Sequence, residues 1–138
     1  MLFPQTVEYA LRAVSSLVIL QKDNLMVSSL NLSKHSNVPS FYLSKILRKL
    51  VKAKLLIAQK GKSGGFKFAK PLKRIKIIDI LDAIDYSLDK NHCAFGWKVC
   101  SQKSPCPLHF LFKDIKDKYF VWANSTTIYD INKSNLIK

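Results

Sequence analysis

The chain has 138 residues, 48% of them hydrophobic, and a formal net charge of +14. This length supports a single domain with a substantial core, and no run of 18 uncharged apolar residues is available to span a membrane. The first 20 residues lack a basic n-region and carry Glu8 and Arg12, so they predict a helix, not a signal peptide, and a cytoplasmic protein. No phosphate-binding glycine loop or nucleophile motif occurs, so we expect no enzymatic activity.

The positive charge is concentrated in the first part of the chain. Residues 1–76 contain fifteen Lys or Arg and two acids, a net charge of +13, whereas residues 77–138 have a net charge of +1. This asymmetry favours a part that binds a polyanion joined to a near-neutral part. Nucleic acid is favoured over a membrane surface or a merely solvated basic face.

Three helices are expected over the first 53 residues. Helical apolar spacing covers 5–21, Ser28 or Ser29 can cap a short helix to about His35, and Pro39 suits the start of a helix over about 40–53. The third helix has an apolar stripe and an opposite face of hydroxyl, aromatic and basic groups. This pattern is typical of the second helix of a helix-turn-helix, whose N-terminal end enters the major groove, although a solubilising lysine face would look similar. Its predicted DNA-contacting residues are Ser40, Phe41, Tyr42, Ser44, Lys45, Arg48, Lys49 and Lys52.

A β-hairpin is expected directly after this helix. Residues 55–60 and 66–69 have the pattern of strands, and the glycine-containing turn 61–65 needs positive φ angles. Three helices followed by a basic hairpin is the order of a winged helix. An ordinary hairpin is the alternative, but we predict a wing that approaches DNA phosphates through Lys60, Lys62, Ser63 and Gly64.

The remaining helices belong to the near-neutral part. A short helix over about 77–86 has an acidic exposed side formed by Asp79, Asp82 and Asp85. A long amphipathic helix over about 107–123 is so apolar that we expect it to pack on a second subunit. The tail from Asn124 is polar, with Ile128 and Ile131 as possible anchors.

All three cysteines lie between the last two helices. Six residues separate Cys93 from Cys100, five separate Cys100 from Cys106, and His109 follows. In a chain without a secretory signal, such thiolates are better interpreted as soft metal ligands or redox centres than as disulfides. Structural zinc usually takes more closely spaced pairs, whereas an iron–sulfur cluster accepts a looser loop. The interpretations are an iron–sulfur cluster with His109 or the distant Glu8 as fourth ligand, a zinc site, or reactive thiols without metal.

The predicted organisation is mainly α with a small β-hairpin wing. It consists of a winged helix-turn-helix DNA-binding domain over 1–87, a cysteine-rich cluster-binding loop over 88–109, and a C-terminal dimerisation helix with its tail over 107–138.

Taken in order, these motifs resemble the Rrf-type family of bacterial winged-helix transcriptional regulators, which includes the IscR- and NsrR-like iron–sulfur sensors. The resemblance covers nearly the whole length. It is carried by Glu8–Arg12, Val38–Leu43, the wing sequence Lys60–Phe66, Ala69–Pro71, Ile77–Asp85, Thr127–Ile131 and the three cysteines in the expected place.

The resemblance implies a homodimer that binds double-stranded DNA at a palindromic promoter site, acting as a repressor. It also implies a 4Fe–4S or 2Fe–2S cluster that senses nitric oxide, redox conditions or iron–sulfur status and sets operator affinity. Residue by residue, Cys93, Cys100 and Cys106 match the cluster ligands, and His109 matches the fourth ligand of the cluster-biosynthesis regulators. Glu8 occupies the position where the nitric-oxide sensors place an acidic ligand from the other subunit.

The sequence departs from the family's usual pattern in the first cysteine gap, which has six residues where five are usual. This departure leaves the cluster type and the subfamily open. Two alternatives accompany the cluster-sensing regulator. One is a zinc-stabilised or thiol-based winged-helix regulator without a cluster. The other is a redox protein whose basic face docks an acidic partner.

Overall fold

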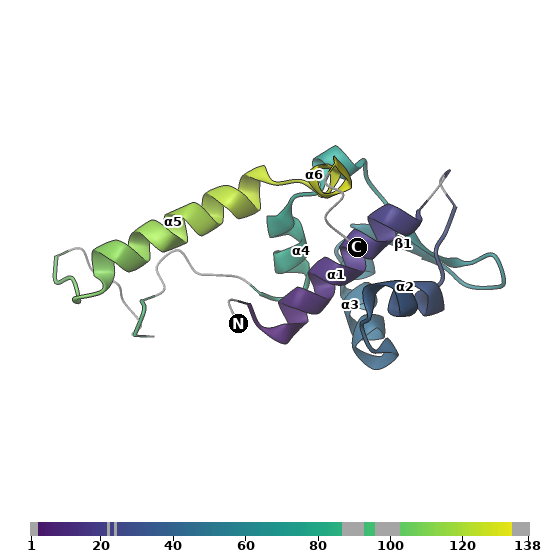
Figure 1. The fold of residues 1–138 in the computed structure, drawn as a ribbon, viewed down its shortest axis with the longest axis horizontal. Coiled ribbons are helices and arrows are strands. Elements are labelled where there is room, and N and C mark those ends of the chain that lie inside the picture. The colour runs from purple at the N-terminus through teal and green to yellow at the C-terminus, as the bar shows by residue number, and fades with distance from the viewer. Residues whose placement is uncertain (1–2, 22, 24, 87–92, 96–102, 134–138) are drawn as a thin grey trace.

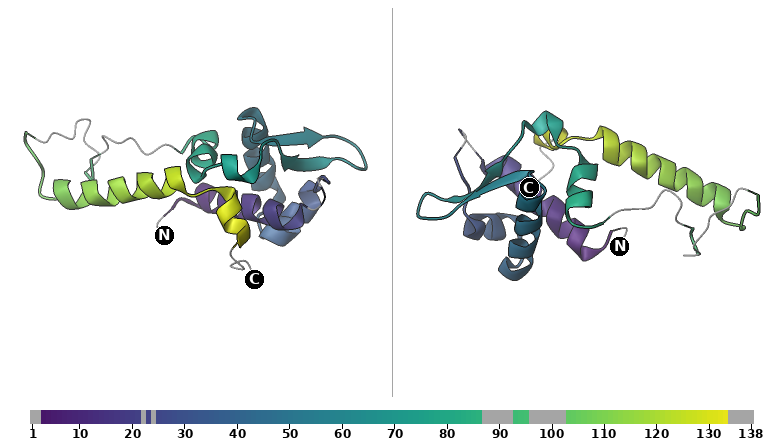
Figure 2. Two further views of the ribbon diagram at one scale, coloured as in Figure 1. Left: turned by 90° about the horizontal axis from the view of Figure 1, so that it is seen from above. Right: turned by 180° about the vertical axis from the view of Figure 1, so that it is seen from behind.

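The computed structural model describes residues 3–21, 23, 25–86, 93–95 and 103–133. Its elements are α1 (Gln5–Leu20), α2 (Ser29–Ser36), α3 (Ser40–Lys52), β1 (Leu56–Gln59), β2 (Gly65–Phe68), the 3-10 turn η1 (Leu72–Arg74), α4 (Ile77–Ala83), α5 (His109–Ser125) and α6 (Ile128–Lys133). The molecule is elongated, with the hairpin projecting from one end and α5 from the other (Figures 1 and 2). The predicted fold class, mainly helical with one antiparallel hairpin, is confirmed.

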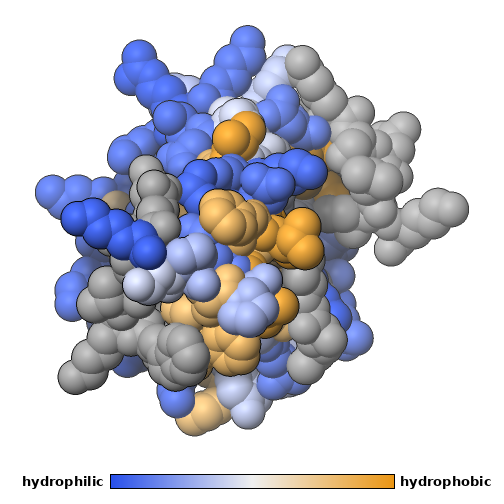
Figure 3. Space-filling view, turned by 90° about the vertical axis from the view of Figure 1, so that its left-hand side faces the viewer, coloured by the Kyte–Doolittle hydropathy of each residue, from blue (hydrophilic) through white to orange (hydrophobic). Residues whose placement is uncertain are grey.

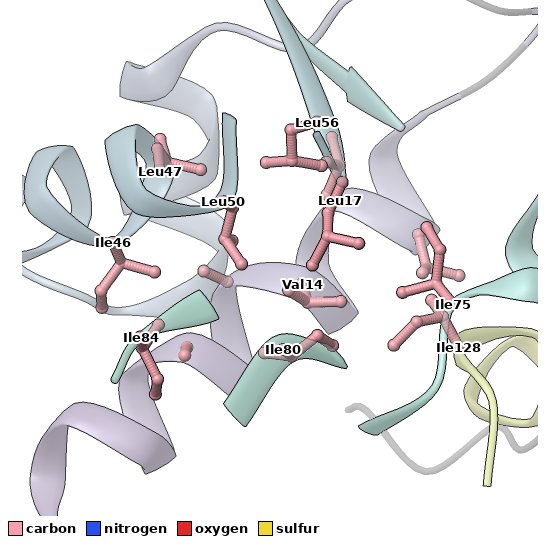
Figure 4. Packing of buried hydrophobic residues seen from close by; sticks show 14 of the residues in the cluster. Val14, Leu17, Ile46, Leu47, Leu50, Leu56, Ile75, Ile80, Ile84 and Ile128 are labelled. Atoms are coloured by element: carbon pink, nitrogen blue, oxygen red, sulfur yellow. The ribbon is translucent and has the colours of Figure 1, made fainter. Parts of the chain in front are cut away.

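α1 is the central helix of the body, and it contacts α2, α3, α4 and α6. Its face of Val7, Ala10, Val14 and Leu17 is 2% exposed or less, because each residue meets apolar side chains of those helices. Figure 4 shows leucines and isoleucines from α3, α4 and the end of the chain pointing toward α1. Each fully buried side chain of this kind stabilises the fold by roughly 1.5–3 kcal/mol.

Local capping groups define the turn between α2 and α3. Ser28 caps α2, since its hydroxyl accepts a hydrogen bond of 3.2 Å from the Asn31 N–H. Asn37 ends α2 in the left-handed conformation at φ 55°, and Pro39 precedes the first residue of α3. The chain can therefore reverse within three residues, and α3 lies across α1 as the second helix of a helix-turn-helix.

The hairpin pairs Leu56 with Phe68 and Gln59 with Gly65, in antiparallel register. It is joined to the body through Val27, whose N–H and C=O exchange hydrogen bonds of 2.9 and 2.8 Å with Phe66. The predicted need for positive φ is confirmed at Gly61 (108°) and Gly65 (142°). Backbone pairing on both sides of β2 therefore fixes the wing relative to the helices.

The end of the chain returns to the body after α5. The N–H of Ile77 donates to Thr126 O at 3.0 Å, and the N–H of Ile128 donates to Ile75 O at 2.9 Å. Ile128 is fully buried, which confirms its predicted role as an anchor. No helix was predicted for this polar tail, yet it forms α6, because Asp130 Oδ2 accepts hydrogen bonds from the N–H and hydroxyl of Thr127 at its start.

None of the helices in the described ranges combines the length and hydropathy that crossing a lipid bilayer requires.

Candidate DNA-binding surface and cysteine segment

α3 turns its basic and hydroxyl-bearing face to solvent. Its apolar residues Leu43, Ile46, Leu47 and Leu50 are 3% exposed or less, because they pack in the core around α1. The eight residues of α3 that were predicted to contact DNA are all exposed: Ser40, Phe41, Tyr42, Ser44, Lys45, Arg48, Lys49 and Lys52. The amphipathic pattern thus sets the orientation of α3, and packing of one face leaves the other available for a partner.

The first turn of α3 is braced by aromatic side chains. The Phe41 ring meets the Tyr42 ring edge-on at a centroid distance of 5.7 Å, and Tyr42 meets Tyr9 of α1 at 5.6 Å. The Lys45 ammonium lies 4.3 Å from the Phe41 ring centroid, within the range of a cation–π contact. Because Tyr42 faces Tyr9, it serves as a support, and Phe41 is the aromatic group that projects outward.

α3 and the hairpin border a common hollow of about 300 Å³. It is lined by Ser29, Ser44, Leu47, Arg48, Val51, Ala58 and Phe66. The hollow places Ser44 and Arg48 beside the strands of the wing. Neither α3 nor the hairpin contains an acidic residue, so the charged side chains that these two elements contribute are all positive. Two adjoining elements whose charged side chains are all positive suit a polyanion.

The tip of the wing exposes Lys60, Lys62 and Ser63. Gly64 differs, because its N–H donates to Gly61 O at 3.1 Å inside the turn and so already has a backbone partner. A Cβ on Gly64 would lie 2.1 Å from Gln59 O. Gly64 therefore closes the turn tightly, and Lys60 and Lys62, which precede it, give the tip of the wing its positive charge.

Lys49, one of the predicted DNA contacts on α3, forms an ion pair with a residue outside that helix. Its Nζ lies 3.1 Å from Asp85 Oδ2, just beyond the end of α4. Both side chains are largely exposed, at 46% and 81%, so the ion pair is weak and can be exchanged for another anion.

The cysteine segment leads into α5. Cys93 is buried, Cys106 is half-buried, and the N–H of His109 donates to Cys106 O at 3.0 Å where α5 begins. His109 is 5% exposed and meets the edge of Phe110 at a centroid distance of 5.1 Å. Glu8 lies half-buried on α1, and Cys100 lies outside the described residues. Within the ranges that the structure covers, no three His, Cys, Asp or Glu side chains gather as a metal site would require.

The donor chemistry of this segment nevertheless suits a soft metal. Thiols and an imidazole are ligands for zinc and for iron–sulfur clusters. The backbone hydrogen bond between His109 and Cys106 keeps those two residues together at the N-terminal end of α5.

The family comparison decides which class of protein carries this fold. A sequence model of the Rrf2 family, described as iron-dependent transcriptional regulators, matches residues 3–134. The chain belongs to the Rrf2 family. It is therefore a helix-turn-helix transcriptional regulator of a DNA-binding family and not an enzyme, as the sequence predicted.

Two curated relatives of this Rrf2 protein match over nearly the whole chain. An HTH-type transcriptional regulator of Aquifex aeolicus is 31% identical over 133 residues, which cover 95% of this chain and 91% of the relative. The regulator IscR of Cereibacter sphaeroides is 28% identical over 131 residues, covering 93% of this chain and 84% of the relative.

Solved structures show the same fold. CymR, the global cysteine regulator of B. subtilis, superposes with a TM-score of 0.79 at 18% identity, covering 98% of this chain and 99% of CymR. IscR of T. potens superposes with a TM-score of 0.74, also at 18% identity, covering 96% of this chain and 87% of that one. Both the sequence match to the family and the superposition on solved structures thus support the winged helix-turn-helix architecture of this Rrf2 protein.

Two residues of this Rrf2 chain that contact α3 from other elements, Tyr9 and Asp85, were not predicted to do so. Tyr9 was expected only as part of a helix, yet it braces Tyr42, and its hydroxyl accepts a hydrogen bond of 2.9 Å from Gln5 Nε2. Asp85 was expected on an acidic exposed side, yet it pairs with Lys49. For the contact of Tyr9 with Tyr42, the only local signal in the sequence was the pair of adjacent aromatic residues at 41 and 42. For the pairing of Lys49 with Asp85, the sequence offered no local signal.

α5 of this Rrf2 chain carries exposed apolar side chains along one side. Leu108, Leu111 and Ile115 recur on one side of the helix and are 46%, 72% and 62% exposed. Viewed from the α5 end of the molecule, hydrophobic side chains form a patch among hydrophilic ones (Figure 3). A groove of about 520 Å³ lies between α5 and the body, lined by Phe3, Tyr86, Phe112, Ile115, Lys116, Lys118, Tyr119 and Trp122.

Proposed function

We propose that this Rrf2-family regulator is a homodimeric repressor that binds a palindromic promoter site, and that an iron–sulfur cluster controls its operator affinity. It would act in the cytoplasm, where promoter DNA lies. The observation that carries the proposal is the hollow bordered by the exposed face of α3 and the basic wing, two elements that contain no acidic residue. That surface lies at the end of the molecule opposite α5 (Figure 1).

Side-chain chemistry indicates which residues would contact bases and which would contact phosphates. Ser40, Phe41, Ser44, Lys45 and Arg48, on the N-terminal and central turns of α3, would face base edges in the major groove. Phosphate contacts would come from Lys49, Lys52, Lys60, Lys62 and Ser63, with Gly64 allowing close approach of the backbone, and would supply affinity without sequence preference. Tyr42 would act mainly by holding Phe41 in place.

Dimerisation through α5 is supported by its exposed apolar side. Leu111 and Ile115 are each more than 60% exposed, and burial of such side chains in a second subunit would remove them from water. A two-fold dimer would also set two α3 helices about one DNA turn apart, as a palindrome requires. In this organisation residues 1–87 bind DNA, 88–109 hold the cluster, and 107–138 form the dimerisation helix and tail.

The cluster is proposed from the donor set. Cys93, Cys100 and Cys106 would be ligands to a 4Fe–4S or 2Fe–2S cluster, completed by His109 or by Glu8 of the second subunit. When bound, the cluster supplies a centre that nitric oxide or oxidants can modify. Burial of Cys93 and His109 would limit access of water to that centre. The iron-dependent description of the family favours iron over zinc, and a zinc-bound or metal-free thiol regulator is the alternative.

The decisive experiment is anaerobic isolation of the full chain, followed by absorbance spectroscopy and DNA-binding titration. We expect a coloured protein whose visible absorbance is lost in Cys100→Ala and on exposure to nitric oxide, with a parallel change in operator affinity. Lys62→Ala should keep the colour and weaken DNA binding at every sequence, which separates the two sites. Colourless protein with stoichiometric zinc would contradict the cluster proposal and would leave the DNA-binding proposal unaffected.

A further inference from the structure

Phe41 is an unusual side chain for the surface of α3. It is 66% exposed on the first turn, whereas the other large hydrophobic groups of α3 are buried or, like Tyr42, braced against another helix. The free protein gains little from exposing a phenyl ring in this way, since its area remains in water. The N-terminal turn of a recognition helix is also the part that meets base edges.

The ring is held in one orientation by its neighbours. Tyr42 meets it at an interplanar angle of 80°, and the Lys45 ammonium lies 4.3 Å from its centroid. Tyr42 is in turn supported by Tyr9, so the ring is tied through two aromatic contacts to the buried helix α1. A ring that is already oriented loses less conformational entropy when it meets a partner.

The side chains present on α3, and those absent from it, limit which DNA bases the helix can recognise. The helix contains no Asp or Glu to accept a hydrogen bond from cytosine N4, and no Asn or Gln to form the paired contact with adenine. Lys45 and Arg48 suit guanine, and the serine hydroxyls suit any base. The apolar group on a major-groove edge is the C5 methyl of thymine, which is the feature that an exposed phenyl ring recognises.

We propose that Phe41 reads thymine C5 methyl groups, so that the operator carries thymine opposite the first turn of α3. This rests on the DNA-binding function proposed above and adds the kind of base that the site selects. Phe41 contributes specificity, and Lys49 and Lys52 of α3 together with the lysines of the wing contribute affinity for any duplex.

The test begins with selection of duplexes from a random library by the full chain. One enriched site is then made in two forms, with thymine or with deoxyuridine at single positions, because uracil differs only by the missing methyl. At the positions that Phe41 faces, wild type should bind the uracil form about fourfold more weakly per methyl, the equivalent of one buried methylene. Phe41→Ala should bind both forms equally and resemble wild type on the uracil form.

Two further variants are matched controls. Lys62→Ala should bind both forms more weakly but keep the wild-type ratio between them, since it changes only phosphate contacts. Phe41→Leu retains an apolar group and should keep part of the ratio. Because Phe41 is mostly exposed, the thermal midpoint of Phe41→Ala should match wild type, which shows that the variant is folded.

The outcomes separate the inference from the function on which it rests. Equal binding of the thymine and uracil forms by wild type overturns the inference, while salt-dependent binding to an enriched site still supports the DNA-binding function. A thymine preference that survives in Phe41→Ala also overturns it, because another side chain would then read the methyl. If no duplex is enriched at all, the DNA-binding function fails and the inference fails with it.

Discussion

Gly65 shows how a single residue attaches the wing to the body. It begins β2 at φ 142°, and a Cβ at this position would lie 2.3 Å from Val27 O. The next residue, Phe66, exchanges both backbone hydrogen bonds with Val27. Only glycine satisfies the backbone angle and this close approach together. The wing is therefore held to the helices at a point where no side chain fits.

We predict that Gly65→Ala destabilises the protein by at least about 2 kcal/mol, through backbone strain and displacement of Val27. This corresponds to a fall in the thermal midpoint of roughly 6–10 °C for a chain of this size, measured by circular dichroism. Gly61→Ala is the matched control, because Gly61 also has a positive φ of 108° but nothing lies within 4 Å of an added Cβ. Equal losses in the two variants would show that contact with Val27 is not the cause.

At the scale of elements, an ion pair between α3 and the segment after α4 engages one cation of the proposed DNA-binding surface. Lys49 Nζ and Asp85 Oδ2 are 3.1 Å apart, and both groups face solvent. Removing the carboxylate would release Lys49 to meet a phosphate and would remove a negative charge close to the surface of α3.

Asp85→Asn should therefore raise affinity for duplex DNA by roughly two- to fivefold at low salt and steepen the salt dependence by up to about one unit of slope. Fluorescence anisotropy across a range of salt concentrations measures both. Asp117→Asn is a suitable control, since it removes an equally short pair, Lys113–Asp117 at 3.0 Å, from α5 at the opposite end of the molecule. Identical slopes for wild type and Asp85→Asn would contradict the idea.

The contact of α5 with the body contains a titratable group. Burial, together with the nearby Tyr86 and Asp82, raises the pKa of Tyr119 from its usual value near 10 to about 12. Between these values the unfolded chain loses a proton that the folded protein keeps. The Tyr119 contribution to stability is thus fully present below pH 10 and is lost as the pH rises toward 12.

Tyr119→Phe should remove this part of the pH dependence. Denaturant unfolding of wild type and variant from pH 8 to about pH 11 should show wild type losing stability relative to the variant above pH 10. At neutral pH we expect little cost, because the Tyr119 hydroxyl is buried without a hydrogen-bond partner among the described residues. A constant difference between the two proteins across this range would refute the shift.

At the scale of the whole molecule, the proposed dimer depends on the exposed apolar side chains of α5. Ile115→Asp should convert the dimer to monomer, because an unpaired carboxylate buried in an apolar interface costs roughly 3–5 kcal/mol. Analytical ultracentrifugation measures the change, and operator affinity should fall at least about tenfold, as the two half-sites are no longer linked. Lys113→Asp places the same acid on the opposite, polar side of α5 and should leave the dimer intact. Wild-type protein that is monomeric at micromolar concentration would rule out this arrangement.

Much of this architecture follows from local patterns in the chain. Helical apolar spacing predicts α1, α3 and α5 to within a few residues, and the glycines between residues 61 and 65 predict the turn of the wing. The face of α3 that stays exposed was also predictable, because one side of a helix must be apolar if it packs on a core. Charge separation along the chain then indicated which part faces a polyanion.

Contacts between distant residues were decided only by the fold. The stripe of Leu108, Leu111, Ile115, Tyr119 and Trp122 is continuous in sequence, yet its first part faces solvent and its last two residues rest against Phe3. The return of Ile128 to the core, the support of Tyr42 by Tyr9 and the pairing of Lys49 with Asp85 join residues 33 or more positions apart. Periodicity and capping act over one or two turns of chain, so they determine elements and their faces. Which faces meet is determined by how the whole set of elements buries its apolar surface together.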